Sequence, residues 1–206
     1  MIQYSIVIEQ PTNEPVTLQQ AKTHLEYTGT LKDSYIDLLI TAGRRLAEAY
    51  CGLSLVTQIR RVELDCFPSG FGFILLPYGP VQSIDSFTYA NEDGTTTTLT
   101  EDTDFKVDYH SRMTRVYAIG SDGQRTCWPS DVRNILSPIR VDYQSGFDDV
   151  SGEATPSEAK VAIMEYCADM FENRGDDQGG KIGDALPWRC MMILDAIKVN
   201  WNANTN

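Results

Sequence analysis

Apolar positions repeat with a helical period near both ends of the chain. Leu18, Ala21 and Leu25 fall on one face of a helix, and Thr17 followed by Gln20 fits a capping box at its start. The pattern therefore predicts a short first helix. A helix of this length is marginal in isolation, so it must pack on a partner surface.

Three further helices follow from the same periodicity. One is predicted over 33–51, with Gly52 as its stop. Another begins at 155–158, where a proline suits the first turn, and ends at 172–174. The last is predicted from 186 to about 199.

Between the second and third helices the apolar period changes to two, which is typical of half-buried strands. Asp93-Gly94 supplies the positive φ of a hairpin turn between two of these runs. Pro77 ends another run, and Pro77 with Pro80 is expected to fix a turn between adjacent strands. The result is a small β unit of about six strands. The extended runs lie near 61–66, 74–76, 81–89, 95–100, 105–109, 116–118 and 139–143.

The predicted fold class is α+β. Two N-terminal and two C-terminal helices form a bundle, and a small antiparallel β unit is inserted between the second and third helices. Residues 1–52 and 156–206 are assigned to the helical core, and 53–155 to the β unit. Residues 175–186, rich in Gly and Asp, are expected to form a flexible connector.

Composition adds bounds on the class of protein. Seventeen Lys and Arg against twenty-nine Asp and Glu give a net charge of −12, which argues against a protein that grips nucleic acid through clustered cations. The N-terminus shows no basic leader, and no apolar run reaches the roughly 18 residues of a membrane span. The cysteines are odd in number and form no C-x-x-C pair, so reduced, mostly buried thiols are expected. They are Cys51, Cys66, Cys127, Cys167 and Cys190.

No motif supports catalysis or a cofactor. His24 and His110 are isolated, and Ser157 with Lys160 matches S-x-x-K without its companion motifs, so Ser157 is interpreted as a helix cap. The acidic turns lack the ligand spacing of a twelve-residue calcium-binding loop, so their carboxylates are interpreted as solvated. These turns are 101–104, 148–149 and 176–177. The protein is therefore predicted not to be an enzyme and to need no cofactor.

Several blocks, in this order and spacing, resemble one family. The match covers roughly residues 14 to 200. The blocks are PVTLQQAKTHL at 15–25, AYCGLSLVTQ at 49–58, LDCFP at 64–68, LPYGPVQS at 76–83, YANEDG at 89–94, WP at 128–129, and Tyr166 with FENR at 171–174. The set is similar to the head–tail connector (adaptor) proteins of tailed bacteriophages and gene transfer agents, in the branch with a β insertion in the helical bundle.

This resemblance implies a structural virion protein made in the host bacterial cytoplasm and located in the neck. Its partners would be further copies of itself, in a ring of about twelve, the portal protein, and a tail-side stopper or tail terminator. DNA would pass through the channel without sequence-specific binding, and no membrane is involved. An acidic channel wall that repels phosphate is a hypothesis that gives the net charge a role.

Large apolar residues gather near the C-terminal end. Trp188, Met191, Met192 and Trp201 are predicted, as a group near the expected connector, to contact a partner. For any single one of them, packing within the helices is the alternative.

Two other classes remain open. One is a hydrolase or lyase with its site on the β unit. The other is a small-molecule or protein-binding module that forms no ring, with an aromatic platform of Phe87, Tyr89, Tyr109 and Tyr117. The oligomeric state, alone and with a portal, separates these classes.

Overall fold

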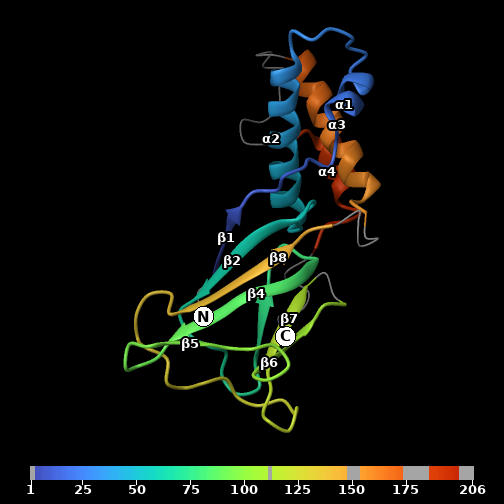
Figure 1. The fold of residues 1–206 in the computed structure, drawn as a ribbon. Coiled ribbons are helices and arrows are strands. Elements are labelled where there is room, and N and C mark those ends of the chain that lie inside the picture. The colour runs from blue at the N-terminus through green and yellow to red at the C-terminus, as the bar shows by residue number, and fades with distance from the viewer. Residues whose placement is uncertain (1–2, 111–112, 148–153, 174–185, 200–206) are drawn as a thin grey trace. The chain divides into compact units, whose positions relative to one another are not determined.

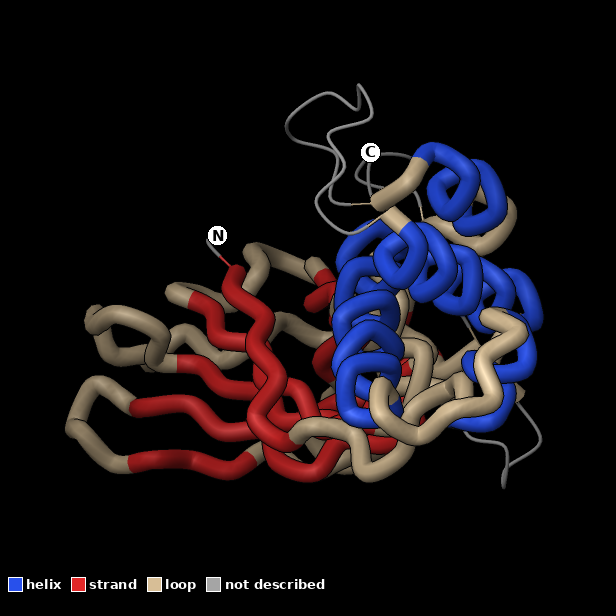
Figure 2. The backbone as a smooth tube through the Cα atoms, turned by 90° about the horizontal axis from the view of Figure 1, so that it is seen from above, coloured by secondary structure: helices blue, strands red, loops and turns tan. Residues whose placement is uncertain are grey.

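Figure 1 shows the computed structural model of the protein. The described residues are 3–110, 113–147, 154–173 and 186–199. The chain divides into two compact units, described separately below. The sheet unit is Met1–Pro11 with Thr57–Gly146, and the helical unit is Thr12–Val56 with Phe147–Asn206. The described strands, red in Figure 2, all belong to the sheet unit, and the described helices, blue, all belong to the helical unit.

The helical unit contains four described helices. Thr17 caps the first one through the predicted box: its hydroxyl accepts from Gln20 N–H, and the Gln20 side chain accepts from Thr17 N–H. Gly52 ends the second in the left-handed region at φ 69°. Both predictions are confirmed. The helices are α1 (Leu18–His24), α2 (Asp33–Cys51), α3 (Ser157–Glu172) and α4 (Trp188–Leu194).

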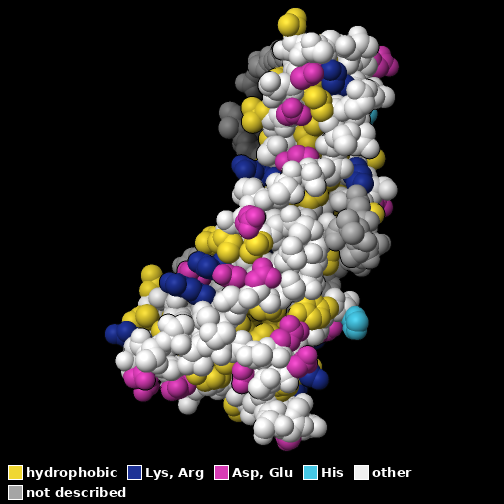
Figure 3. Space-filling model, viewed as in Figure 1, with side chains coloured by type: hydrophobic (Ala, Val, Ile, Leu, Met, Phe, Trp, Pro, Cys, Tyr) yellow, Lys and Arg dark blue, Asp and Glu magenta, His cyan; other side chains and the backbone are white. Residues whose placement is uncertain are grey.

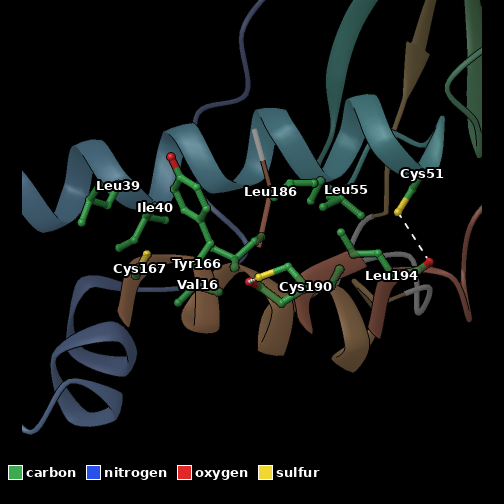
Figure 4. Close-up of a cluster of buried hydrophobic side chains, with 14 of the residues drawn as sticks. Val16, Leu39, Ile40, Cys51, Leu55, Tyr166, Cys167, Leu186, Cys190 and Leu194 are labelled. Carbon is green, nitrogen blue, oxygen red and sulfur yellow. Dashed lines mark hydrogen bonds between the residues drawn. The ribbon is translucent and has the colours of Figure 1, made fainter. Parts of the chain in front are cut away.

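A close approach between α2 and α3 forms the core of this unit. A Cβ on Gly43 would lie 2.9 Å from Cδ1 of Tyr166, so only glycine fits this crossing without a shift. In Figure 4, Leu39 and Ile40 of α2 point toward the side chains of α3. Burial of these apolar groups is the main favourable term for the packing of these helices.

The sheet unit contains two antiparallel sheets, so the described chain is α+β with four helices and two sheets. The five-stranded sheet has the order β1 (Gln3–Glu9), β2 (Gln58–Leu64), β8 (Ile139–Ser145), β4 (Val81–Ala90), β5 (Thr96–Thr98). The three-stranded sheet has the order β3 (Phe73–Leu76), β7 (Thr114–Ala118), β6 (Phe105–Asp108).

An aromatic cluster fills the core of the sheet unit. Phe87 of β4 meets Phe105 of β6 with ring centres 5.1 Å apart, so the inner faces of the two sheets pack together. Phe67 stacks on Trp128 at 5.0 Å, and the Trp128 indole N–H donates to the Gly72 carbonyl at 2.9 Å. These contacts join the loop between β2 and β3 to the loop between β7 and β8.

The N-terminal segment corrects the predicted domain boundary. Residues 1–52 were expected to belong to the helices, but Gln3–Glu9 pairs with β2 as the edge of the five-stranded sheet. Together with the seven extended runs found in the sequence, β1 brings the described residues to eight strands, where about six were predicted. The sequence alternates there too, but the strand has no local partner, since its partner lies at least fifty residues further along the chain.

The proline-rich turn also differs from expectation. β3 and β4, which it joins, were expected to be adjacent strands. They belong to different sheets, β3 pairing with β7 and β4 with β8 and β5. Pro77 and Pro80 therefore lie where the chain passes from one sheet to the other, with Tyr78 between them at φ 59°.

Helix ends account for the remaining differences. The last helix ends at Leu194, not near 199, and continues only as turns. Pro156 is the N-cap of α3 and no side chain caps this end, so the interpretation of Ser157 as a cap is wrong. The expected connector 175–186 lies outside the described residues except for Leu186, which is buried.

Candidate functional site

The last helix is the element on which the sequence placed the partner contacts. Hydrogen bonds from two cysteine thiols hold the side of this helix that faces α2 and α3. The Cys190 S–H of α4 donates to the Ala162 carbonyl of α3 at 3.3 Å, and the Cys51 S–H of α2 donates to the Leu194 carbonyl at 3.8 Å (Figure 4). Both contacts are buried, so α4 is seated on α2 and α3 through its apolar side.

The turns after α4 are tied to the end of α2. The Tyr50 hydroxyl donates to Asp195 Oδ1 at 2.6 Å, the Val199 N–H donates to the Cys51 carbonyl at 2.9 Å, and Lys198 Nζ lies 3.9 Å from the Tyr50 ring centre. The bond to the Asp195 carboxylate, with a smaller contribution from burial, raises the pKa of Tyr50 to about 12. These contacts anchor one side of α4 and leave the opposite side exposed.

That surface carries two of the four predicted contact residues. Trp188 is 63% exposed and Met192 is 65% exposed, one helical turn apart. Met191 instead packs partly buried against the helical core, and Trp201 lies outside the described residues. Large apolar groups held in the open on an anchored helix are typical of contact surfaces, and their contact with a partner stays a prediction.

A groove between α3 and α4 borders this surface. It encloses about 390 Å³, and Trp188 and Arg189 of α4 line it opposite Glu165, Asp169 and Glu172 of α3. The sequence reasoning missed this acidic wall. The three carboxylates are spaced i, i+4, i+7 on one helix, which could have revealed it. The groove suits a basic, partly apolar segment.

The buried thiols lead to a direct prediction. Burial raises the pKa of Cys51 and Cys167 to about 12, and burial with the nearby carboxylates raises that of Cys190 to about 11. Cys66 and Cys127 are exposed. We expect two thiols of the native protein to react quickly with a thiol reagent at pH 8 and three only after denaturation. Fast reaction of all five would contradict this packing.

The residues considered for catalysis do not form a site. His24 Nε2 lies 3.8 Å from Glu165 Oε1 at the surface, and His110 is exposed in the turn after β6. No hydrogen bond among the described residues joins the side chains of Ser157 and Lys160. Within the described ranges, no group of three or more His, Cys, Asp or Glu side chains could hold a metal ion. No helix in this part of the chain is long and apolar enough to cross a bilayer.

The aromatic platform considered for a binding module is not an open surface. Phe87 and Tyr89 are buried in the core of the sheet unit. The Tyr109 hydroxyl donates to the Glu101 carboxylate at 2.9 Å, and the Arg125 guanidinium lies 5.5 Å from the Tyr117 ring centre. The four rings therefore serve packing and ion contacts.

Solved structures of gene transfer agent particles contain chains that are similar in fold to this one. A chain in the virion of a native gene transfer agent (GTA) particle is 16% identical and covers 95% of each chain with a TM-score of 0.72. The chain shares the fold of GTA particle chains. A chain from the neck of an empty GTA particle computed with C6 symmetry is 19% identical over 97% of this chain and 96% of that one, TM-score 0.69. One from the neck of a native GTA particle computed with C12 symmetry covers the same shares at 19% identity, TM-score 0.66. No protein-family description and no curated protein matches the sequence.

Proposed function

We propose that this chain is a structural subunit of a virion neck, a head–tail connector (adaptor) that forms a ring and joins the capsid to the tail. The observation that carries the proposal is the likeness of fold over at least 95% of both chains to GTA particle chains. Two of these come from necks computed with C6 and C12 symmetry, which supports a ring of about twelve copies. The subunit catalyses no reaction.

In this role the helices form the connector core, and the strands between α2 and α3 are an insertion in it. The ring docks on the portal, binds a tail-side stopper or tail terminator below, and lets DNA pass through its channel. A net charge of −12 favours the passage of DNA through the channel over its binding to the wall. Tight binding of DNA needs Lys and Arg side chains that replace the counterions of the phosphates. The protein is made in the host bacterial cytoplasm and works in the virion neck.

The exposed side of α4 is the proposed portal contact. Trp188 and Met192 supply the apolar anchors, with Met191 beneath them and Trp201 further along the chain. Aromatic anchors surrounded by polar groups carry a large share of the binding energy in many interfaces.

Replacing Trp188 and Met192 together with alanine tests this contact. We expect binding to a purified portal ring to weaken by at least about tenfold, because two exposed anchors are removed. Both side chains are mostly in solvent, so far-UV circular dichroism should stay unchanged. Affinity is measured by biolayer interferometry with the full-length chain.

Leu136→Ala is the matched control, since Leu136 is 81% exposed but lies in the sheet unit. Equal portal affinity for the double variant and wild type would reject α4 as the contact. The wider proposal is tested by mass photometry and electron microscopy of the chain with and without the portal. A ring supports it, and a chain that stays monomeric in both conditions rejects it.

A further inference from the structure

A cluster of cations stands out on the sheet unit of this acidic protein. The outer face of the three-stranded sheet carries Arg115 on β7 and Lys106 on β6, and the loop after β7 adds Arg125. Phe71, 63% exposed, precedes β3 beside them. We name Phe71, Lys106, Arg115 and Arg125 the cationic face.

Aromatic rings hold the two arginines in place. The Arg115 guanidinium lies 5.1 Å from the Phe73 ring centre, and that of Arg125 lies 5.5 Å from the Tyr117 ring centre. Phe73 and Tyr117 are directly opposite each other in the β3–β7 ladder, so the two stacks are neighbours. Arg125 also donates to the Phe71 carbonyl, which fixes it beside the exposed Phe71 ring.

These cations lack a carboxylate partner. Among the described residues, no ion pair involves Lys106, Arg115 or Arg125, and the buried Nε of Arg115 has no hydrogen-bond partner. Asp108 is opposite Arg115 in the β6–β7 ladder, and its Oδ1 accepts from the His110 N–H at 3.2 Å, so its carboxylate is the anion of this face. Three cations against this one carboxylate leave the face with a net positive charge.

The chemistry of the face fits protein carboxylates better than nucleic acid. Its guanidiniums already lie over Phe73 and Tyr117, so these rings are not free to stack with bases. Three cations on a chain of net charge −12 are few for a phosphate backbone. Aromatic residues and arginine are enriched in protein–protein interfaces, and this face combines two arginines with the exposed ring of Phe71.

A complementary surface lies elsewhere on the same unit. The turn between β4 and β5 exposes Glu92 and Asp93, and bonds from the Thr95 N–H and hydroxyl lower the pKa of Asp93. The Asp131 carbonyl accepts from the Glu92 N–H of this turn at 2.9 Å, and the Arg133 guanidinium lies beside Gly94. Figure 1 shows this turn projecting from the side away from β6 and β7, and Figure 3 shows acidic side chains at that end, near a Lys or Arg side chain.

We propose that the cationic face of one copy binds the acidic β4–β5 turn of the next copy in the assembled ring. Two different, oppositely charged surfaces on one compact unit generate head-to-tail association, which closes into a ring when the rotation permits. This inference rests on the proposed ring and names one of its interfaces.

A charge exchange tests the pairing. Arg125→Glu and Glu92→Arg should each raise the protein concentration needed for half-assembly by about tenfold, because each places like charges together. The double variant Arg125→Glu/Glu92→Arg carries the exchanged pair at every interface and should assemble as wild type does. Arg140→Glu, the same charge change on the five-stranded sheet, is the control and should leave assembly unchanged. Assembly is followed by mass photometry, with the portal ring as nucleus.

A photo-crosslinker at position 71 identifies the partner directly. In assembled rings it should attach to the peptide that contains residues 91–95 of another copy. Attachment to DNA or to a different protein would overturn the inference, as would rings that form equally well with Arg125→Glu. If wild-type chains form no ring even with the portal, the proposed function fails and this interface with it.

Discussion

Replacing Arg44 with alanine is expected to lower the free energy of unfolding of the helical unit by about 3–5 kcal/mol. Arg44 is only 2% exposed, and its Nε lies 2.7 Å from Glu14 Oε2 while Nη1 lies 2.9 Å from Glu48 Oε2. Glu48 Oε1 in turn accepts from the Leu55 N–H at 2.9 Å. Removing the guanidinium leaves the buried Glu48 carboxylate uncompensated, which costs more than the ion pair itself contributes.

The measurement is urea denaturation followed by circular dichroism at 222 nm, which reports on the helices. Arg45→Ala is the matched control, because Arg45 is the next residue on α2 but is exposed. We expect the control to change stability by less than about 1 kcal/mol. Equal, small effects of the two substitutions would show that the buried network does not hold the segment before α1 to α2.

Replacing Phe87 with alanine is expected to destabilise the sheet unit by about 3–5 kcal/mol. Its ring is 1% exposed and meets Phe105 at 5.1 Å, Trp128 at 5.7 Å and Phe67 at 6.2 Å. The substitution opens a cavity at the centre of this cluster, and the surrounding strands cannot close it without breaking their ladders.

Unfolding of this unit can be followed by hydrogen exchange of amides in β4 and β8, which pair through the middle of the five-stranded sheet. Phe71→Ala is the control, since that ring is 63% exposed and should contribute little to stability. Unchanged protection of β4 in the Phe87 variant would mean that the aromatic cluster is not the core of the unit.

The two proposed contacts assign different roles to the two units. The exposed side of α4 would bind the portal through apolar anchors, whereas the cationic face and the acidic turn would join neighbouring copies through charge. Their dependence on salt should differ accordingly, because ion pairs at a surface are screened and apolar burial is not. Separate effects of salt on portal affinity and on ring assembly would agree with this division.

Local features were predicted well. The capping box of Thr17 and Gln20, the stop at Gly52 and the β4–β5 hairpin with Gly94 at φ 90° are all confirmed. The alternation of β2 is confirmed as far as Leu64. Each depends on atoms within a few residues of one another, so the sequence alone contains the information.

The candidate site could be predicted only in part. The exposure of Trp188 and Met192 agrees with a contact surface near the C-terminal end, whereas Met191 packs partly buried against the core. The groove lined by Glu165 and Asp169 was not predicted, because it exists only where α3 and α4 pack together. The cationic face was missed for the same reason: it joins β6, β7 and a loop.

The sequence by itself determined where most helices and turns begin and end and which face of a strand is apolar, since caps, positive φ and alternation are local. The tertiary structure alone decided that β1 completes the five-stranded sheet, that Pro77 and Pro80 lie between two sheets, and that Arg44 is buried. These outcomes depend on contacts between residues far apart in the chain. The free energy of these contacts is gained only once distant segments have packed together within a unit, so a local sequence pattern cannot predict them.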